Sequence, residues 1–560
     1  MFSEIELLRW QKATLPEELE HDLKTSEDLQ DQFYRYLEFG TGGMRGKMGA
    51  GPNRINIYTI RRAASGLAEY LHEIGRYQNG VAISFDSRIH SRDFAIETAR
   101  VLAAKDIPVF LSEELRPTPE LSFMVREFKA AAGVMITASH NPSIYNGFKV
   151  YDEAGCQITP EAADQILAFM AEKEDIFAIP VTDSELIQTI GSEIDDLYLK
   201  KAEVVTKRPN LIADKGSELK IVYTPLHGSG RKLVTTSLQN AGFKNVYLVP
   251  EQSEPDGEFK TVQSPNPEEV ESFKLAFQYG KKKHADILMA TDPDADRLGV
   301  AVLNEEMNYQ ILTGNQLGAL LFYYLLSEKD EVTSNDYLVT TVVTNDLGRK
   351  IAEHYGASHT ETLTGFKFIG EKIAEFEKEG KQFLFGYEES YGYLVAPFVR
   401  DKDAIQAALL TAEMALYFKE KGKTLLAVLD ELYEKFGYHA EALLNLAFEG
   451  EDGSEAMNEL LLKLRKTDVL PHIAQKIDFK SGHLDLPKTN MLLFCFDEGD
   501  RVFIRPSGTE PKCKIYIQVV RASAEKAQKA MEELKEMSVR GKSTKGYGRT
   551  KRNDSTTCVP

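Results

Sequence analysis

The sequence is poor in cysteine and has no long apolar run. No stretch approaches the roughly 20 consecutive apolar residues that a membrane helix needs. The first residues also lack the charged, apolar and small-residue series of a signal peptide. The four cysteines do not have the spacing of zinc ligands or of a disulfide framework, so neither is expected. We therefore expect a reducing, cytoplasmic setting. The cysteines are Cys156, Cys495, Cys513 and Cys558.

Positive charge is scarce as well, since the formal net charge is −19 at pH 7. A protein that binds nucleic acid usually carries a basic stripe, so no nucleic-acid partner is expected. A small anionic ligand remains compatible, because a few arginines and lysines can hold a phosphate within an acidic protein. The Gly-x-x-x-x-Gly-Lys-Ser/Thr loop of many nucleotide-binding proteins is absent.

The chain of 560 residues is too long for a single core, and three or four domains are expected. Segments typical of strands and helices alternate up to residue 423, and the alternation restarts twice. This pattern indicates α/β domains whose sheets are largely parallel. Closely spaced strands and a closing helix then indicate a smaller α+β domain. The predicted domains are residues 1–205, 206–308, 309–423 and 424–537.

The last segment, residues 538–560, differs from the rest of the chain. Residues 537–560 contain six Lys or Arg and one Asp, with no apolar periodicity. We expect this tail to be disordered and assign it no function.

One apolar strand is followed by reactive side chains. In GVMITASHNP, residues 133–142, the apolar segment precedes Ser139 and His140, and a proline closes the loop. Ligands of open α/β sheets bind beyond the carboxyl ends of the strands, so Ser139 is a candidate nucleophile. An ordinary strand-to-helix turn would look similar. Side chains of neighbouring residues diverge on extended backbone, so His140 is not expected to be the base for Ser139.

A second strand ends in three alternating aspartates, Asp292, Asp294 and Asp296, in TDPDADR. Alternation in extended chain places the three carboxylates on one side. Converging carboxylates need a hard cation, and Mg²⁺ suits oxygen ligands. The EF-hand pattern does not fit, because Arg297 and Leu303 stand where it requires glycine and glutamate. A solvated acidic turn is the remaining alternative.

Three further loops carry polar or glycine-rich patterns. GYEESYG, residues 386–392, offers hydrogen-bonding groups for sugar hydroxyls, although a solvated turn would look the same. RPSGTEPK, residues 505–512, combines an arginine fork, hydroxyls and a glycine, and is typical of a phosphate cradle. FGTGGMRG, residues 39–46, does not follow a clear strand, so it is not a dinucleotide motif; we expect it to bring Arg45 close to Ser139.

Together the four motifs TASHNP, DPDADR, GYEES and RPSGTEPK, in this order, resemble those of the α-D-phosphohexomutase superfamily. The resemblance extends to about Met537. FGTGGMRG, PDGEFKTVQSPNPEE and GYEESYGYLVAPFVRDKDAI are most similar to bacterial phosphoglucomutases of the phosphoglucomutase-2/phosphopentomutase group. The resemblance implies four domains around a central cleft, three of them α/β with mixed sheets and the last a smaller α+β unit.

The resemblance also implies roles for individual residues. Ser139 would be the phosphorylated residue, and one Mg²⁺ would be held by the three aspartates and the phosphate on Ser139. Candidates for charge stabilisation and proton transfer are Arg45, His140, Lys149 and Lys367. Substrate binding is expected from Arg297, Thr364, Gly365, Glu388, Ser390, Arg505, Ser507, Gly508 and Thr509.

The implied activity is the interconversion of glucose 1-phosphate and glucose 6-phosphate through a phosphoserine and glucose 1,6-bisphosphate, which also acts as activator. Phosphopentomutase or phosphomannomutase activity is the alternative within the same chemistry. A metal-dependent phosphomonoesterase and a non-enzymatic sugar-phosphate sensor are alternatives from other classes. The expected partner is a phosphosugar, and the chain is expected to be a monomer or a weak homo-oligomer.

Overall fold

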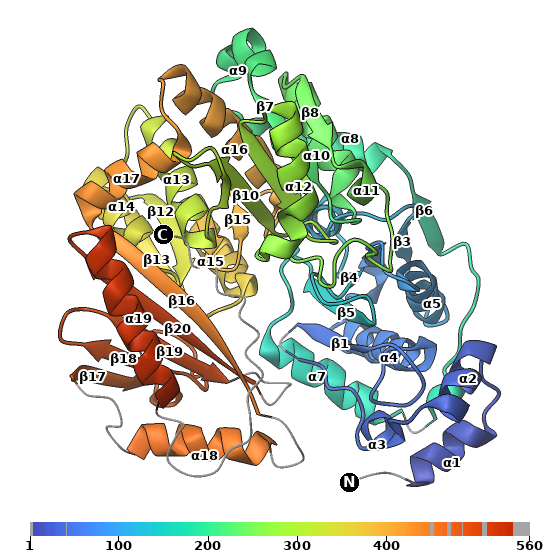
Figure 1. Ribbon diagram of the computed structural model, residues 1–560. Coiled ribbons are helices and arrows are strands. Elements are labelled where there is room, and N and C mark those ends of the chain that lie inside the picture. Colours follow the sequence, from blue (N-terminus) through green and yellow to red (C-terminus); the bar gives the residue numbers. More distant parts are fainter. Residues whose placement is uncertain are drawn as a thin grey trace.

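The computed structural model describes residues 4–40, 42–173, 175–448, 453–466, 472–483, 485–506 and 512–540. These residues form four sheets, each with its own helices (Figure 1). The sheets follow one another along the chain, so each predicted restart of the alternation corresponds to a new sheet. We number the domains one to four in that order.

An N-terminal helical segment precedes the first sheet, and the sequence patterns above do not predict it. Its core is Trp10, which is fully buried and packs edge-on against Phe33, Tyr58 and Phe177. Acidic residues fill the first turn of its second helix, where they interact favourably with the helix dipole. The helices are α1 (Glu4–Lys12), α2 (Glu17–Thr25) and α3 (Leu29–Phe33).

Domain one is built on a mixed six-stranded sheet with the order β1-β5-β4-β2-β3-β6. β4, β2, β3 and β6 run parallel; β5 pairs antiparallel with β4 at one edge, and β1 pairs antiparallel with β5. The strands are β1 (Gly43–Lys47), β2 (Val81–Phe85), β3 (Val109–Ser112), β4 (Ala132–Ile136), β5 (Tyr145–Asp152) and β6 (Ile187–Ile190). The main helices are α4 (Ile57–Glu73), α5 (Ser91–Ala103), α6 (Thr118–Glu127), α7 (Pro160–Ala171) and α8 (Glu193–Ala202).

Domain two has the sheet order β11-β10-β9-β7-β8, with β9, β7 and β8 parallel. Its strands are β7 (Lys220–Thr224), β8 (Asn245–Leu248), β9 (Ile287–Thr291), β10 (Leu298–Leu303) and β11 (Tyr309–Ile311). Its helices are α9 (Pro209–Lys215), α10 (Gly230–Ala241), α11 (Pro250–Ser253) and α12 (Val270–Lys283). β11 pairs with β10 although it lies just beyond the predicted boundary at residue 308.

Domain three has the order β13-β12-β14-β15, in which only β15 is antiparallel. Its strands are β12 (Asp336–Thr341), β13 (Ser358–Thr362), β14 (Gln382–Glu388) and β15 (Gly392–Leu394). Its helices are α13 (Gly314–Ser327), α14 (Leu347–Tyr355), α15 (Phe366–Glu379), α16 (Ala404–Glu420) and α17 (Leu425–Phe436). α17 packs against α13 and α14, whereas the predicted boundary at residue 423 assigned it to the last domain.

Domain four is an antiparallel sheet with the order β16-β20-β19-β18-β17, covered by α19. Its strands are β16 (Tyr438–Ala447), β17 (Ile473–Asp478), β18 (Leu492–Phe496), β19 (Arg501–Pro506) and β20 (Lys512–Arg521). Its helices are α18 (Gly453–Lys466) and α19 (Ala524–Arg540). α19 continues past the predicted end at residue 537, and the predicted tail from residue 541 on lies outside the described residues.

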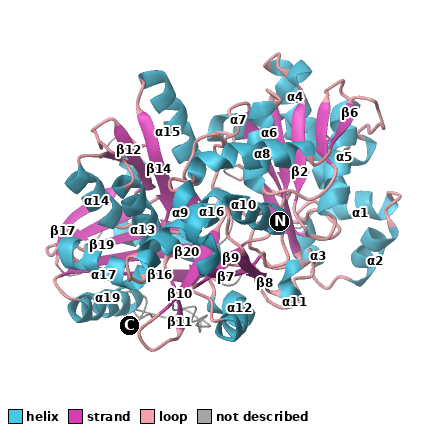
Figure 2. Cartoon of the chain, turned by 90° about the horizontal axis from the view of Figure 1, so that it is seen from above, coloured by secondary structure: helices cyan, strands magenta, loops and turns pink. Residues whose placement is uncertain are grey.

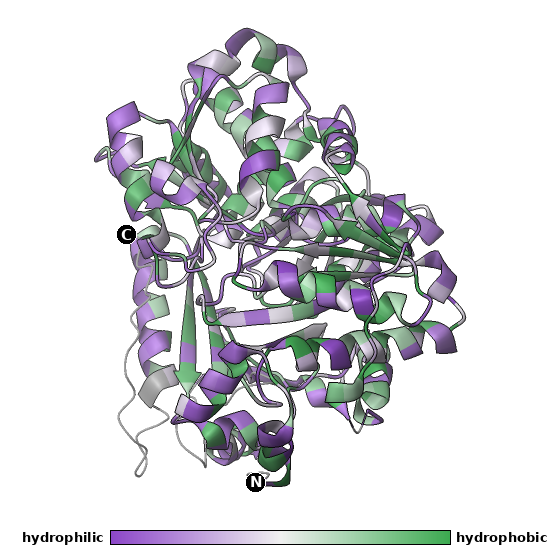
Figure 3. Ribbon diagram, turned by 90° about the vertical axis from the view of Figure 1, so that its right-hand side faces the viewer, coloured by the Kyte–Doolittle hydropathy of each residue, from purple (hydrophilic) through white to green (hydrophobic). Residues whose placement is uncertain are grey.

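The central strands of the first two domains are apolar on both faces. Every residue of β2, β4 and β9 is buried, as expected for strands covered by helices on each side. Figure 3 shows the hydrophobic residues concentrated on the strands and the hydrophilic ones on the outer faces of helices. The predicted α/β class with mixed sheets and an α+β last domain is confirmed, while the residue pattern alone suggested more parallel pairing than these sheets have.

A single apolar cluster joins three of the domains. It runs from α6 and α8 of domain one through the sheet of domain two into the helices of domain three. Domain four has its own core, formed by one face of its sheet with α18 and α19. A smaller cluster, including Val342, Leu363, Phe503 and Tyr516, joins domain four to domain three. The turned view in Figure 2 shows the helices around these sheets.

Candidate active site

The loop after β4 presents Ser139 from a strained but well-held backbone. Ser139 has a φ of 49°, in the left-handed region that non-glycine residues seldom adopt, and its side chain is almost fully buried. Its amide donates a hydrogen bond to Thr137 Oγ1 at 2.8 Å. Strain of this kind persists where the surroundings hold the loop.

Arg88 supplies that support from the end of β2. Its guanidinium donates hydrogen bonds to the backbone carbonyl groups of Ser139, Asn141, Pro142 and Tyr145. Asp86 holds Arg88 in place through an ion pair of 3.2 Å and accepts a hydrogen bond from Thr137. Burial lowers the pKa of Arg88, and the opposite charge of Asp86 limits this effect. The segment FDSR, residues 85–88, therefore supports the Ser139 loop from the end of the neighbouring strand.

His140 lies closer to Ser139 than its sequence position predicts. Its Nδ1 is 3.1 Å from Ser139 Oγ, so the expectation that the two side chains diverge is wrong. That expectation assumed extended backbone, whereas the left-handed φ of Ser139 turns the two side chains together. Loss of hydration and the nearby Arg297, Arg45 and Lys514 cations lower the pKa of His140 well below its usual value, which favours the neutral ring.

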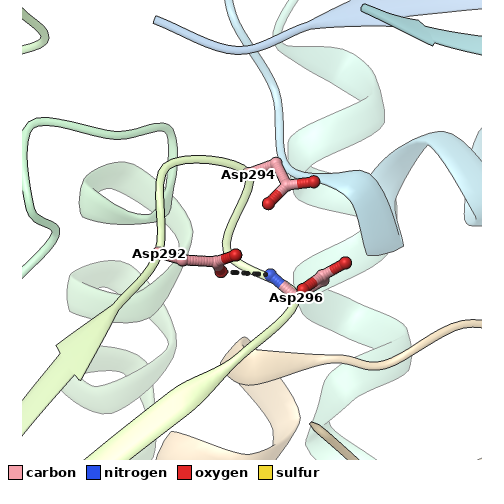
Figure 4. Close-up of side chains that lie close together, drawn as sticks. All are labelled: Asp292, Asp294 and Asp296. Atoms are coloured by element: carbon pink, nitrogen blue, oxygen red, sulfur yellow. Dashed lines mark hydrogen bonds between the residues drawn. The ribbon is translucent and has the colours of Figure 1, made fainter. Parts of the chain in front are cut away.

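The three aspartates meet on the turn between β9 and β10. Their carboxylates converge as Figure 4 shows, with one oxygen of each within 4.8 Å of the others. Asp292 Oδ1 accepts hydrogen bonds from the amides of Asp296 and Arg297 at 3.1 and 3.0 Å, which closes the turn. All three side chains are essentially inaccessible to solvent.

The nucleophile and the aspartates belong to one site, although they come from different domains. Ser139 Oγ donates a hydrogen bond to Asp292 Oδ2 at 2.7 Å. Thr118, the first residue of α6, donates a second inter-domain hydrogen bond to Asp294 Oδ2 at 2.9 Å. The expected placement of the carboxylates around Ser139 therefore matches the geometry.

This donor set suits a divalent cation. Asp294 Oδ1 and Asp296 Oδ1 are buried and have no hydrogen-bond partner among the described residues. Burial first, and then the charges of Asp294 and Asp296, raise the pKa of Asp292 well above its ordinary value. A hard cation among these oxygens would remove both the unpaired acceptors and the repulsion.

Two lysines already offset part of this negative charge. Lys149, on β5, places its Nζ 2.8 Å from Asp294 Oδ2 and 3.5 Å from Asp296 Oδ2. Lys402, from the segment before α16, places its Nζ 3.1 Å from Asp296 Oδ2. Burial raises the pKa of Asp294, but Lys149 and several hydrogen bonds outweigh it, so the net shift is downward.

Lys402 lies at the aspartate cluster, and the sequence patterns did not point to it. It is 7% exposed and also pairs with Asp401, at 3.1 Å. Burial lowers its pKa, but the surrounding carboxylates Asp296, Asp401 and Glu388 raise it above the ordinary lysine value. The alternating charges of RDKDA, directly before an apolar helix, were the available signal.

The predicted sugar loop lies beside this cluster. Glu388, at the end of β14, accepts a hydrogen bond from the amide of Gly365 at 2.9 Å. Gly365 has a φ of 121°, which favours glycine, and Thr364 Oγ1 is buried with no hydrogen-bond partner within the described part of the chain. Arg297 forms an ion pair of 2.5 Å with Glu268 and bridges by its backbone to Gly392. Ser390 is half-buried on the same loop.

Two other predicted cations lie at different places. Arg45, on β1 opposite Gly147 of β5, is exposed and donates a hydrogen bond to Asn141 Oδ1 at 3.0 Å, so the glycine-rich segment does reach the Ser139 loop. Lys367, on α15, is buried, which lowers its pKa, and the charges acting on it are those of Glu371 and Glu161 rather than the aspartates.

Domain four contributes cations from the paired strands β19 and β20. Arg505 lies opposite Lys514 in the register. The charges of Glu268, Arg297 and Glu389 act on Lys514, so groups of three domains meet there. Ser507, Gly508 and Thr509, the rest of the predicted phosphate cradle, lie outside the described residues.

Models of one protein family match four consecutive parts of the chain. The phosphoglucomutase/phosphomannomutase α/β/α domains I, II and III match residues 36–176, 196–305 and 313–436, and the C-terminal domain matches residues 443–536. A phosphoglucomutase of Staphylococcus aureus (strain bovine RF122 / ET3-1) is 36% identical over 519 residues, covering 89% of this chain and 92% of that protein. The chain belongs to the phosphoglucomutase/phosphomannomutase family.

A second relative is similar in sequence, and two solved structures share the fold. A phosphoglucomutase of Staphylococcus epidermidis (strain ATCC 35984) is 36% identical and covers 89% of this chain and 93% of its own. The crystal structure of a putative phosphomannomutase from Thermus thermophilus has a TM-score of 0.68 at 23% identity, covering 90% and 99% of the two chains. The open form of pp63/parafusin from Paramecium has a TM-score of 0.67 at 18% identity, covering 91% and 95%.

Membership in the phosphoglucomutase/phosphomannomutase family confirms the predicted superfamily and makes this chain an isomerase that transfers a phosphoryl group. It also argues against a sensor that only binds. Within the described part of the chain, no helix is both long and apolar enough to span a bilayer.

Proposed function

We propose that this protein is a phosphoglucomutase that interconverts α-D-glucose 1-phosphate and glucose 6-phosphate through a phosphorylated Ser139. The observation that carries the proposal is the 2.7 Å contact between Ser139 Oγ and Asp292 Oδ2, at the junction of two domains. It places a buried hydroxyl beside a carboxylate cluster suited to a cation. The relatives named phosphoglucomutase support glucose phosphate as the substrate.

In the proposed reaction, phospho-Ser139 is the donor. A free hydroxyl of the sugar phosphate attacks the phosphorus atom, the bond to Ser139 Oγ breaks, and glucose 1,6-bisphosphate forms. The bisphosphate turns around and returns its other phosphate to Ser139. Glucose 1,6-bisphosphate therefore also acts as activator, because it can load an unphosphorylated enzyme.

One Mg²⁺ is the proposed ion, held by Asp292, Asp294 and Asp296, where it would draw charge from the phosphate on Ser139. Lys149 and Lys402 stabilise the negative charge that develops on the transferring group. Burial lowers the pKa of Lys149, but Asp294 and Asp296 raise it above its ordinary value, so Lys149 is proposed to donate a proton to the leaving oxygen and not to take one from the attacking hydroxyl. His140 contacts Ser139 Oγ. The charges that act on Lys367 are those of Glu371 and Glu161 and not those of the aspartates.

The sugar is proposed to bind between the aspartates and domain four. Glu388 and Ser390 would hydrogen-bond its secondary hydroxyls, with Thr364, Gly365 and Arg297 alongside. The phosphate that is not reacting would be held by Arg505, Ser507, Gly508 and Thr509. This end must accept the 1-phosphate and the 6-phosphate in turn, so it must recognise phosphate rather than one pose of the sugar.

A coupled assay tests the proposal. Purified protein is given glucose 1-phosphate with Mg²⁺ and catalytic glucose 1,6-bisphosphate, and formation of glucose 6-phosphate is followed. Intact mass, before and after incubation with the bisphosphate, should show one added phosphoryl group that the Ser139→Ala variant does not acquire. Mannose 1-phosphate and ribose 1-phosphate, run in parallel, should turn over more slowly.

Other results would assign a different activity. Faster conversion of ribose 1-phosphate or mannose 1-phosphate would make the protein a phosphopentomutase or a phosphomannomutase. Inorganic phosphate released as fast as the substrate is consumed would make it a phosphomonoesterase. A cytoplasmic location and a monomeric or weakly associating state remain predictions, which fractionation and sedimentation can check.

A further inference from the structure

A pocket lies between the N-terminal helical segment and domain one, and no step of the proposed reaction uses it. Its volume is about 470 Å³. It lies among α1, α4 and the end of α7, which sit together near the N-terminus in Figure 1. The lining residues are Glu6, Arg9, Tyr36, Arg62, Ala171, Lys173 and Asp175. We call it the N-terminal pocket.

Arg62 is the central group of the N-terminal pocket. It is 8% exposed, and its guanidinium lies 4.1 Å from the centre of the Tyr36 ring. Nε donates a hydrogen bond to the carbonyl of Met170 at 2.9 Å. Within the described part of the chain, the two terminal nitrogens, Nη1 and Nη2, have no hydrogen bond or ion pair.

The acidic residues of the pocket pair with other residues of the pocket, and Arg9 lies 3.1 Å from Glu6 and 3.9 Å from Asp175. Glu6 accepts hydrogen bonds from the Tyr36 hydroxyl at 2.8 Å and from Arg9 at 3.1 Å. Asp175 accepts a hydrogen bond from the amide of Phe177 at 3.0 Å. The charge of Glu6 still acts on Arg62, yet it makes no direct ion pair with it.

Nη1 and Nη2 of Arg62 are not among the buried polar atoms that lack a partner, so they open into the pocket, where an anion can replace water. A guanidinium taken out of water loses hydration that only hydrogen bonds and an opposite charge restore. Burial lowers the pKa of Arg62, which is consistent with this loss of hydration. The planar edge formed by Nη1 and Nη2 matches the two oxygens of a carboxylate or phosphate.

We propose that the N-terminal pocket binds a small metabolite through an oxyanion group held by Arg62. Arg9 and Lys173 also line the pocket, but Arg9 pairs with Glu6 and Asp175 and Lys173 pairs with Glu69 at 2.9 Å, so Arg62 is the cation left to bind the anion. Ligand sites of this kind commonly have volumes of about 300–1,000 Å³, so the pocket has room for more than a bare ion. The ligand is a phosphorylated or carboxylated small molecule that binds apart from Ser139.

Trp10 gives a local signal for such binding. It is the only tryptophan of the chain, it is fully buried, and it lies on α1 next to Arg9. Its ring packs against Tyr58, which lies on α4, and against Phe177, which lies two residues after Asp175. Occupation of the pocket should therefore change its fluorescence, whereas binding at Ser139 has no tryptophan nearby to report it.

The test is a titration of the full-length protein, followed by Trp10 fluorescence, with inorganic phosphate in one series and citrate in another at constant ionic strength. We expect a saturable change with at least one anion, and the tighter of the two assigns a phosphorylated or a carboxylated ligand. Arg62→Met should weaken the apparent affinity at least tenfold. Lys24→Met, which removes an exposed cation from α2 outside the pocket, should leave it unchanged.

Arg62 is buried, so its variant needs a check on folding. Arg9→Met, at the more exposed rim, is the second variant and should weaken binding several-fold while the protein keeps its circular dichroism spectrum. The proposal is overturned if neither anion gives a saturable change in the wild type. It is also overturned if folded Arg62→Met or Arg9→Met titrates like the wild type, because the signal would then come from another site. Neither result bears on the mutase assay.

Discussion

The two ends of the proposed substrate site are held in different ways. At the Ser139 end, three domains share a continuous apolar core, and the reacting groups are joined across domain boundaries by hydrogen bonds such as Ser139 to Asp292 and Thr118 to Asp294. At the Arg505 end, the cations belong to a domain with its own core. Lys514 is open to solvent there, whereas the three aspartates are inaccessible.

Domain four is attached to domain three by a compact set of contacts. Glu441 accepts hydrogen bonds from Thr313, Asn315 and Asn345, and Arg501 pairs with Asp346. A small apolar cluster lies beside them. A unit with its own core can move as a body about such a boundary. The difference is that the groups proposed to transfer the phosphoryl lie in a rigid, shared core, whereas the cations proposed to bind the second phosphate lie on a domain with a core of its own.

Removal of the nucleophile should have the largest effect. Ser139→Ala should reduce mutase turnover by at least about 10³-fold, because no other group can carry the phosphoryl. Substrate binding, measured by calorimetry, should change far less, since the domain-four cations remain. Ser84→Ala, a buried serine on β2 that bonds to Ser112, is the matched control and should stay active. An active Ser139→Ala enzyme would show that Ser139 does not carry the phosphoryl group, and the contrast between the two ends would then have no basis.

Removal of the metal should have the second-largest effect, and it should act only on the Ser139 end of the site. Chelation should bring activity to background, and Mg²⁺ should restore it. An ion at 100 times its Kd contributes about 2.7 kcal/mol to stability, so the unfolding temperature should fall as well. Hydrogen exchange should increase at the turn between β9 and β10 but not in β18 and β19. Faster exchange in both places would show that the two ends are not independent.

The kinetics of Lys402→Met test whether this lysine acts in the transfer step at the Ser139 end of the site. Loss of a positioned charge beside Asp296 should lower kcat by about 10²-fold with a smaller change in KM, because the charge matters most during transfer. Lys381→Met, a partly exposed lysine of the same domain, should leave both constants unchanged. A change confined to KM would place Lys402 with the binding groups instead.

Lys514→Met tests the other end and should give the opposite pattern. Loss of an exposed cation should raise KM by about tenfold while kcat changes by less than about threefold, since charged contacts open to solvent are weak and screened. Higher salt should reduce the difference between the variant and the wild type. Lys512→Met, on the same strand, is the control. A large fall in kcat would mean that domain four takes part in the transfer step.

Much of this architecture could be predicted from the sequence, because the decisive signals are local. The apolar segments that became β2, β4, β7, β9, β12 and β14 end in polar loops, and strand ends are where α/β sheets bind ligands. Ser139 and the three aspartates followed from such loops. The prediction of their meeting rested on the family resemblance, since nothing in the spacing of residues 139 and 292 requires contact.

Other features depend on tertiary structure and could not be read in advance. The contact of His140 with Ser139 arises from one left-handed φ value, which Arg88 and Asp86 support from another strand. Lys402 resembles any surface lysine until the chain folds it against Asp296. α17 carries the pattern of a domain start, but its apolar face packs on α13 and α14. In each case the partner lies far away in sequence.

The smallest expected effect is a pH dependence of folding stability, and it arises from Glu389, which lies between the two ends of the site. Burial, with the charge of Glu388 second, raises the pKa of Glu389 from its ordinary 4.5 to about 7, and Lys514 of domain four partly opposes this. The folded state therefore favours the neutral carboxyl. Its contribution to stability is complete below pH 4.5 and is lost as the pH rises through about 7.

Glu389→Gln keeps a neutral group at all pH values, so the variant should lose less stability than the wild type between pH 5 and pH 8. Urea unfolding of both proteins across this range measures the difference, and Glu353→Gln, on the exposed surface of α14, is the control. Parallel curves would mean that Glu389 is already ionised at pH 5. The approach of Lys514 would then hold domain four at the site more firmly than its exposure indicates, and the contrast between the two ends would be smaller than we infer.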